Sequence, residues 1–277
     1  MILKDKTILI MGIRNKWSIA YGAAKAASEQ GAKLCFTFMG EDNRPKIEEL
    51  ISEFEGAKAY TCDASIDSDI ESLYEKIKVD YGKLDGIVHC IAHAFTEDLH
   101  NDFIETSKEG YAHAVDVSAY TLVAVARIAK NMDMLNENSS IVSLTYHGST
   151  KVLPGYNVMG VAKAALECSV RYLADNLGQM GIRVNAVSAG PIKTLSAKGI
   201  KDFNSILDVV EEKSPLHKNV TKEQVGNTVA FMLSSMSDAI TGQVIYADNG
   251  YNIMGWASEL AKANSLEIFN KVTNITT

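Results

Sequence analysis

The stretch Thr7-Ile8-Leu9-Ile10-Met11-Gly12 is an apolar run that ends at a glycine. Continuous apolar character of this kind is typical of a strand that is buried on both faces. The run from Ser18 to Ser28 follows, and its small apolar residues recur at helical spacing. A buried strand, a glycine turn and a helix in this order predict the first unit of a parallel α/β sheet.

The same alternation continues through the chain. Further strands are expected at residues 33–38, 58–62, 86–91, 140–144, 183–187 and 244–246, and helices at 46–54, 66–81, 107–132, 158–180 and 221–235. Strands that alternate with helices predict a parallel sheet covered on both faces. We therefore expect an α/β protein: a single-domain, doubly wound (Rossmann-like) parallel sheet of seven strands with helices on both faces.

Two segments depart from this alternation. Residues 193–216 form an insertion between the sixth strand and the last helix, and residues 257–277 form a polar tail. No linker, repeat or low-complexity stretch divides the rest of the chain. The sequence therefore predicts one domain, residues 1–256, followed by a C-terminal tail.

Composition and charge exclude several classes of protein. The chain has 277 residues, 47% of them hydrophobic and 22% charged, which is near the globular average. Its net charge of −7 argues against nucleic acid as the main partner, which requires a basic face. The sequence lacks a signal-peptide pattern and any run of about eighteen apolar residues, so we expect a cytoplasmic protein without a membrane span. The four cysteines lack zinc-ligand spacing and are expected to be reduced thiols, and no metal site is predicted.

The first strand–helix turn is a candidate phosphate site. Ligands of a doubly wound sheet bind at the carboxyl ends of the strands, and Gly12 ends the first strand. A helix that begins near Ser18 directs free N–H groups and the positive end of its dipole toward a pyrophosphate. Only Gly12 matches the usual glycine-rich pattern, so an ordinary turn with a serine N-cap is the alternative.

The residues after the second and third strands bear on the cofactor. The second strand runs into Met39-Gly40-Glu41-Asp42-Asn43-Arg44, where the first charges are negative. A carboxylate there suits the free ribose hydroxyl of NADH, whereas a basic pair holds the extra phosphate of NADPH. We expect NADH, and Arg44 leaves NADPH open. Asp63, after the third strand, is either an acceptor for the adenine amino group or a helix N-cap.

Tyr146, Tyr156 and Lys163 form the strongest candidate for chemistry. Tyr156 and Lys163 are seven residues apart, so a helix that begins by Tyr156 places both on nearly the same face. An ammonium near a phenol favours the phenolate and polarises the O–H, and such a phenol stabilises an oxyanion on a substrate carbonyl. The alternative is two aromatic residues at the solvent edge and a surface lysine.

Four motifs carry a resemblance to a known family. They are Tyr156-Asn157-Val158-Met159-Gly160-Val161-Ala162-Lys163-Ala164, residues 181–197 (GIRVNAVSAGPIKTLSA), Ser18-Ile19-Ala20-Tyr21-Gly22 and Val225-Gly226-Asn227. With these motifs, over about residues 3–256, the chain resembles the short-chain dehydrogenase/reductase superfamily and, within it, the bacterial NADH-dependent enoyl-acyl-carrier-protein reductases. Most of that superfamily carries Tyr-x3-Lys, but Met159 stands at that tyrosine position. Tyr156 and Lys163 instead match the Tyr-x6-Lys of the enoyl reductases.

The resemblance implies a role for each site residue. Tyr146, Tyr156 and Lys163 are the implied catalytic group, in which Tyr156 bonds the thioester carbonyl beside Tyr146 and Lys163 bonds the nicotinamide ribose. Cofactor contacts are implied for Gly12, Ser18 and Ile19 at the pyrophosphate, Asp63 and Ala64 at adenine, Ile91 and Ala92 at ribose and nicotinamide, and Ile192 and Thr194 at the carboxamide and phosphates. Met39 stands where basic residues mark an NADPH-preferring relative. Ala94, Met159, Ile200 and Phe203 complete the implied substrate pocket, with residues 193–216 as a mobile substrate-binding loop.

The implied reaction is the NADH-dependent reduction of the trans-2 double bond of enoyl-acyl-carrier-protein thioesters in bacterial fatty-acid synthesis. The alternatives are a short-chain reductase or dehydrogenase of a carbonyl substrate, and a non-catalytic NAD(H)-binding sensor. The implied partner is acidic acyl carrier protein, for which Lys193, Lys198 and Lys201 are candidate contacts, and relatives are usually homotetramers. His93 and His147 are expected to line the pocket, with a proton relay as the alternative.

Overall fold

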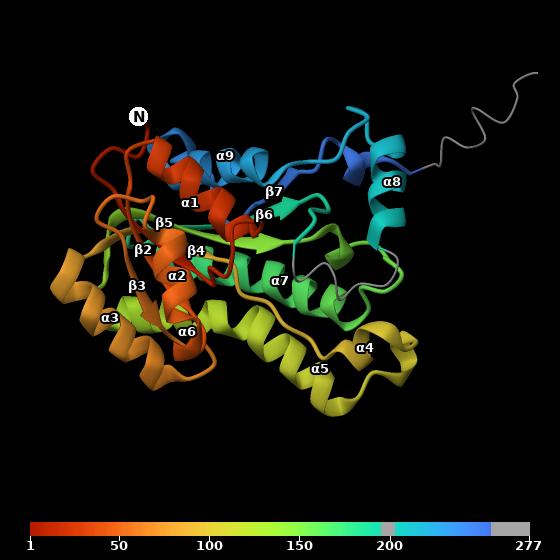
Figure 1. The fold of residues 1–277 in the computed structure, drawn as a ribbon, viewed down its shortest axis with the longest axis horizontal. Coiled ribbons are helices and arrows are strands. Elements are labelled where there is room, and N and C mark those ends of the chain that lie inside the picture. Colours follow the sequence, from red (N-terminus) through yellow and green to blue (C-terminus); the bar gives the residue numbers. More distant parts are fainter. Residues whose placement is uncertain (195–202, 256–277) are drawn as a thin grey trace, which may run out of the picture.

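A seven-stranded parallel sheet forms the centre of the protein, as the computed structural model shows for residues 1–194 and 203–255 (Figure 1). Its strands are β1 (Thr7–Met11), β2 (Lys33–Phe38), β3 (Lys58–Thr61), β4 (Leu84–His89), β5 (Leu135–Thr145), β6 (Arg183–Ala189) and β7 (Val244–Ala247). They pair in the order β3-β2-β1-β4-β5-β6-β7, all parallel. The predicted doubly wound fold is therefore confirmed.

The helices are α1 (Ile19–Glu29), α2 (Arg44–Ile51), α3 (Asp67–Tyr81), α4 (Thr96–His100), α5 (Lys108–Val115), α6 (Thr121–Asn131), α7 (Val158–Gly178), α8 (Phe203–Lys213) and α9 (Lys222–Leu233). Short 3₁₀ turns lie at Glu41–Asn43, Phe103–Glu105, His147–Ser149, Ser235–Ser237 and Tyr251–Ile253. Within the predicted insertion, residues 193–216, the structure describes a helix, α8, over residues 203–213. The predicted tail, residues 257–277, lies outside the described residues.

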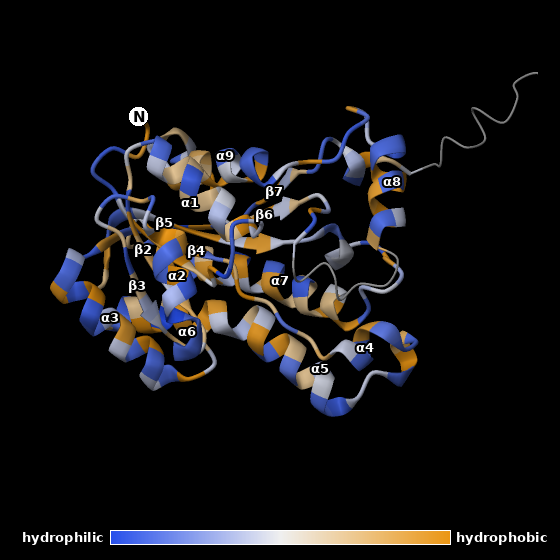
Figure 2. Ribbon diagram, in the orientation of Figure 1, coloured by the Kyte–Doolittle hydropathy of each residue, from blue (hydrophilic) through white to orange (hydrophobic). Residues whose placement is uncertain are grey.

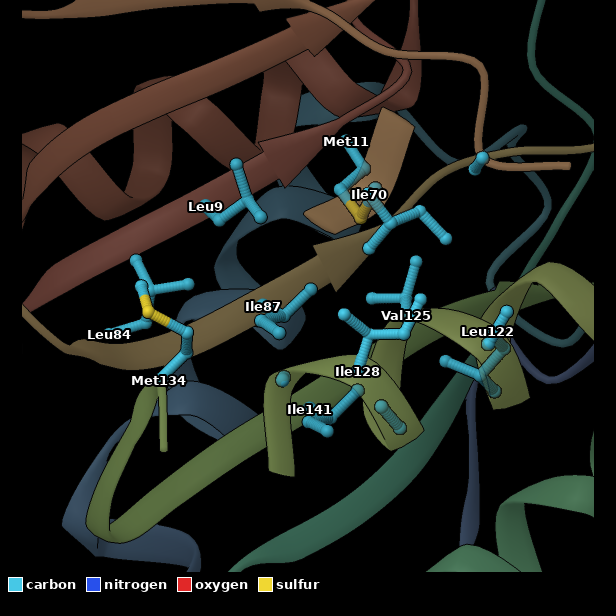
Figure 3. Close-up of a cluster of buried hydrophobic side chains, with 14 of the residues drawn as sticks. Leu9, Met11, Ile70, Leu84, Ile87, Leu122, Val125, Ile128, Met134 and Ile141 are labelled. Carbon is cyan, nitrogen blue, oxygen red and sulfur yellow. The ribbon is translucent and has the colours of Figure 1, made fainter. Parts of the chain in front are cut away.

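Successive side chains of the strands point to opposite faces and build two cores. On β1, Leu9 and Met11 join the core under α3, α6 and α7. Figure 3 shows them with Ile70 of α3 and with Leu122, Val125 and Ile128 of α6. Ile8 and Ile10 join the core under α1, α2 and α9. In Figure 2 the strands are mainly hydrophobic and the outward turns of the helices are hydrophilic. Burial on both faces explains why the strands lack polar alternation.

The predicted continuous helix over residues 107–132 is wrong in one respect: a π-helical turn, Asp116–Tyr120, separates α5 from α6. The Thr121 N–H bonds the carbonyl of Asp116, five residues back, and the Thr121 hydroxyl bonds the carbonyl of Val117 at 2.7 Å. Residues Lys108–Asn131 are long and apolar enough to cross a membrane, but 56% of the apolar window is buried inside the protein. Packing against the core accounts for this apolar composition.

The switch in strand order lies between β1 and β4. The chain leaves β1 toward β2 on one side and returns as β4 on the other. Met11 pairs with His89, so the segments after both strands start side by side. A doubly wound sheet opens a ligand crevice at this point, outside the carboxyl ends of the strands.

Gly226 brings α9 into backbone contact with α1. A Cβ on Gly226 would overlap the carbonyl oxygen of Gly22, which no rotamer change relieves. We therefore expect Gly226→Ala to lower the free energy of unfolding by about 2–3 kcal/mol, as overpacking does. Urea unfolding followed by circular dichroism measures this. Gly178→Ala is the control, because a Cβ there meets nothing within 4 Å, and equal stability of both variants would contradict the prediction.

Candidate active site

Gly12 forms the turn between β1 and α1 in a conformation that favours glycine, with φ at +81°. Its N–H donates to the carbonyl of Thr37 at 3.1 Å. A Cβ at this position would lie 2.7 Å from the carbonyl oxygen of Cys90, the residue after β4. Gly12 therefore lets the turn after β1 pack closely against the backbone after β4, where the crevice begins.

Ser18 is the N-cap of α1, and Ile19 is the first residue of that helix. The Ser18 hydroxyl accepts from the N–H of Tyr21 at 3.2 Å and donates to the carbonyl of Asn15 at 2.8 Å. Ser18 is therefore a helix N-cap, as the alternative interpretation predicts. An N-cap is compatible with phosphate binding, because α1 is eleven residues long and its N-terminal end follows the turn after β1.

At the end of β2, Met39 is 70% exposed and Arg44 is already engaged. The Arg44 guanidinium donates to both carboxylate oxygens of Glu41, at 2.6 and 2.8 Å, and to the Thr61 hydroxyl at 3.2 Å. Hydrogen bonds from Arg44 and Thr61 lower the pKa of Glu41 to about 2. This acid–base pair therefore remains ionised at neutral pH beside the position expected for the adenosine ribose.

Asp63 holds the turn after β3. One of its carboxylate oxygens accepts from both the N–H and the hydroxyl of Ser65, at 3.0 and 2.7 Å. The N-cap of α3 is Ile66, so the N-cap alternative for Asp63 is wrong: its side chain stabilises the turn before the helix instead. Ala64 is buried behind it.

The segment after β4 is held by Ser118, which lies in the π-helical turn. Its buried hydroxyl accepts from the N–H of His93 at 3.0 Å and lies 3.2 Å from the carbonyl of the same residue. Ala94 packs in a small apolar cluster with Met159. Ile91 packs against the core, whereas Ala92 is exposed. The sequence does not predict this role of Ser118, because a serine within an apolar helical stretch gives no sign of a π turn that directs its hydroxyl to His93.

Tyr156 and Tyr146 meet at the carboxyl end of β5. Their rings pack edge to face with centroids 4.9 Å apart. The Tyr156 ring also lies against Gly148, where a Cβ would come within 2.5 Å of its Cδ1. Burial, together with Tyr146 and Glu167, raises the pKa of Tyr156. The phenol is therefore a neutral hydrogen-bond donor at physiological pH.

The prediction that a helix beginning by Tyr156 places this side chain is wrong. Helix α7 begins at Val158, so Tyr156 precedes it, and Asn157 between them has φ at +41°. The Asn157 amide donates to the carbonyl of Asn101 at 2.7 Å, which anchors the turn to the segment after α4. Helical periodicity alone therefore does not place Tyr156. Burial also outweighs the expected effect of an ammonium, because the pKa of the phenol is raised and the phenolate is not favoured.

Lys163 is buried on α7, with 6% of its surface exposed. Its ammonium donates to the carbonyl of Leu144, near the end of β5, at 2.7 Å. Burial lowers the pKa of Lys163 to about 8, opposed by Cys90 and Glu167. The alternative of a surface lysine is therefore wrong. A buried, titratable ammonium at the carboxyl end of β5 suits the ribose hydroxyls of a dinucleotide.

The remaining expected site residues lie before and after residues 195–202, which the structure does not describe. Ile192 packs against the core after β6, and Thr194 ends the described segment there. Phe203 begins α8 on the other side, and Ile200 lies outside the described residues. His93 and His147 contact different residues. His93 lies 2.7 Å from His113, nitrogen to nitrogen, whereas His147 packs against Tyr246 and Tyr251, so no contact links them as a relay.

The strand order and this crevice define a class of protein, the dinucleotide-dependent oxidoreductases of the short-chain dehydrogenase/reductase type. Residues 12–252 match the family model described as enoyl-(acyl carrier protein) reductase. The chain belongs to this family of enzymes.

Individual relatives agree with the family assignment. The enoyl-[acyl-carrier-protein] reductase [NADH] FabI of Bacillus cereus is 47% identical over 92% of this chain and 99% of the relative. The [NADPH] FabI of Staphylococcus aureus is also 47% identical, over 90% and 98%. A crystal structure of the Bacillus cereus reductase with NADP+ and indole naphthyridinone covers 92% of this chain and 99% of its own, with a TM-score of 0.89. The reductase of Anaplasma phagocytophilum with NAD has a TM-score of 0.88 at 34% identity, covering 94% and 96%.

Proposed function

We propose that this protein reduces the trans-2 double bond of enoyl thioesters carried by acyl carrier protein, with NADH as the reductant. The observation that carries the proposal is the Tyr146–Tyr156 pair at the carboxyl end of β5, with Lys163 buried on the adjoining helix. Met159 is buried at the position where carbonyl reductases of the superfamily carry tyrosine, and a thioether has no acid–base chemistry. This favours reduction of a carbon–carbon double bond over reduction of a ketone.

The side chains support this reaction by orientation and charge. When bound, NADH supplies the hydride that adds to the β-carbon of the enoyl group. Negative charge then develops on the thioester oxygen, and the neutral phenol of Tyr156 donates a hydrogen bond to it. Tyr146 packs against the Tyr156 ring and limits its rotation. Lys163, held by Leu144, donates to the ribose hydroxyls of the dinucleotide and so positions it.

The remaining cofactor contacts follow from the same arrangement. Gly12, Ser18 and Ile19 hold the pyrophosphate at the N-terminal end of α1. Asp63 and Ala64 would contact the adenine, Ile91 and Ala92 would line the ribose and nicotinamide, and Ile192 and Thr194 would hold the carboxamide and phosphates. Ala94, Met159 and Phe203 supply apolar surface for the acyl chain. Together with Ile200 they form the proposed substrate pocket, within a single domain of residues 1–256 whose substrate-binding loop is 193–216.

The direct test follows the absorbance of the reduced nicotinamide while crotonyl thioester is added. Oxidation of NADH that depends on the enoyl thioester supports the proposal. Acetoacetyl thioester, which offers a ketone in place of the double bond, is the matched control substrate. Faster turnover of acetoacetyl thioester, or binding of NADH without any turnover, would contradict it and favour the carbonyl reductase or the sensor, respectively.

The preference for NADH rests on the surroundings of Met39. A 2′-phosphate needs a free cationic partner at this place, but the Arg44 guanidinium is held by Glu41 through two hydrogen bonds. Met39 itself supplies no charge. Relatives of both kinds exist, since similar proteins are named for NADH and for NADPH. The Glu41–Arg44 pair therefore argues for NADH in this chain.

Glu41→Ala is expected to release Arg44 for a 2′-phosphate. We expect the ratio of kcat/KM for NADPH to that for NADH to rise about tenfold, since a charge-assisted hydrogen bond contributes about 1.5–3 kcal/mol. Steady-state kinetics with crotonyl thioester and each cofactor measures the ratio. Asp42→Ala, which removes the neighbouring exposed carboxylate, is the control, and an unchanged ratio in Glu41→Ala would refute the role of this pair.

The carrier protein is expected to dock beside residues 193–216. Lys193 is exposed at the described edge of this segment, and Lys198 and Lys201 lie outside the described residues.

We further propose a cytoplasmic homotetramer. Tyr120 on the π turn and Tyr172 on α7 are large exposed side chains, which an apolar partner surface would cover. Sedimentation equilibrium of the purified protein tests the oligomeric state.

A further inference from the structure

Glu167 is a buried acidic residue that the reaction described above does not use. Only 7% of its surface is exposed, although it lies within an otherwise apolar stretch of α7. One of its carboxylate oxygens accepts from the Thr145 hydroxyl at 2.7 Å. Acidic side chains are rarely buried to this degree unless they are paired. Its hydrogen-bond partner is Thr145, and Glu167 lies one helical turn after Lys163, which makes the two side chains neighbours on the surface of α7.

Two turns of α7 thereby hold two successive residues of β5. Lys163 donates to the carbonyl of Leu144, and Glu167 accepts from the hydroxyl of Thr145. The next residue in the chain is Tyr146, which packs against Tyr156. The end of the strand is therefore fastened to the helix by one cationic and one anionic side chain.

We propose that Glu167 is a positioning residue that keeps Lys163 in its ammonium form for dinucleotide binding while holding Thr145 at the end of β5. The proposal rests on the proposed function, in which NADH is the ligand of Lys163. The buried carboxylate of Glu167 would stabilise the ammonium of Lys163, which a neutral side chain of equal shape does not do.

The charges around Lys163 single out Glu167. Burial lowers the pKa of Lys163 to about 8, and Cys90 and Glu167 act in the opposite direction. Burial raises the pKa of the Cys90 thiol to about 12, so this group is neutral in the relevant range. His89, which faces Lys163 from β4, is neutral as well, because burial lowers its pKa to about 3.

The other titratable groups at the end of β5 are also neutral near pH 8. Burial raises the pKa of Tyr146 to about 12 and also raises that of Tyr156. Burial lowers the pKa of His147, although Asp248 and Glu167 act in the opposite direction. Among the described groups that act on Lys163, Glu167 thus carries the opposite charge. Its removal destabilises the ammonium, so Lys163 loses its proton at a lower pH.

The test measures the dissociation constant of NADH by fluorescence between pH 6 and about pH 10, a readout independent of turnover. We expect binding by the unaltered protein to weaken above a midpoint near pH 8, where Lys163 deprotonates. Glu167→Gln, which keeps the shape of the side chain, is expected to move this midpoint down by about one to two pH units. Asp175→Asn removes an exposed carboxylate from the same helix and is expected to leave the midpoint unchanged.

Thr145→Val separates the electrostatic role from a structural one. It removes the hydrogen bond to Glu167 but keeps the charge, so the midpoint is expected to stay near that of the unaltered protein. An unchanged midpoint in Glu167→Gln, or an equal downward shift in Thr145→Val, overturns the proposal while crotonyl thioester reduction continues. Failure of the unaltered protein to bind NADH would instead overturn the proposed function.

Discussion

Tyr156→Phe is expected to lower kcat for crotonyl thioester by about 100- to 1000-fold, the usual loss when one donor to a developing oxyanion is removed. The substitution deletes the phenolic O–H and leaves the ring that packs against Tyr146 and Gly148. The dissociation constant of NADH is expected to stay within about twofold, because the donor acts on the substrate and is used in the transition state. Stopped-flow kinetics and fluorescence titration measure the two quantities separately.

A matched control for this substitution lies on α5. Tyr111→Phe removes an equivalent hydroxyl from a side chain that is 44% exposed and that has no part in the proposed site, so its kcat is expected to be unchanged. If Tyr156→Phe retained its kcat, the hydrogen bond to the thioester oxygen would have no part in the reaction. If it lost NADH binding instead, the phenol would belong to the cofactor site.

Lys163→Met is expected to reduce kcat/KM by on the order of 1000-fold, with losses in both NADH affinity and kcat, since positioning and proton-linked effects each contribute factors of about 100 or more. Methionine fills the buried volume but does not donate to Leu144 or to a ribose hydroxyl. The pH dependence of NADH binding near pH 8 is also expected to disappear, because the group that titrates there is gone. Binding titrations at several pH values and steady-state kinetics provide the measurement.

The stability of Lys163→Met distinguishes lost function from lost fold. The pKa of Lys163 is lowered in the folded protein, so between about pH 8 and its ordinary value the unfolded chain binds more protons than the folded one. Stability then rises with pH across this window, and below it the buried ammonium opposes folding. A neutral methionine is therefore expected to retain the thermal midpoint at pH 7. Lys130→Met, at an exposed site on α6, is the control, and a large drop in thermal midpoint for Lys163→Met alone would attribute its lost activity to unfolding.

The strands were predictable because their side chains are apolar on both faces. The predicted strand at residues 140–144 is longer in the structure, where β5 spans Leu135–Thr145. Its first part is polar and partly exposed, and the register with β4 shifts there, so local pattern carries no strand signal. The predicted helix at 46–54 begins earlier as α2, Arg44–Ile51, with Pro45 in its first turn.

The sequence predicts which residues belong to the candidate site better than it predicts how their side chains are placed. Gly12 and Ser18 carry their turn and cap chemistry in their own residue types, and the structure places both as expected. Tyr156 departs from expectation because Asn157 takes a positive φ and bonds a carbonyl from the segment after α4. Such a contact joins residues far apart in the chain, which periodicity does not register.

Local chemistry in the amino-acid order is enough for the parallel sheet, the crevice at its carboxyl edge and the Tyr-x6-Lys spacing, because apolar periodicity and turn residues act over a few positions. Tertiary packing alone decides the electrostatic state of the site. Burial lowers the pKa of Lys163, raises that of Tyr156 and brings Glu167 to the end of β5 through Thr145. These effects depend on which groups are removed from water together, and that is set only when strand and helix pack against each other.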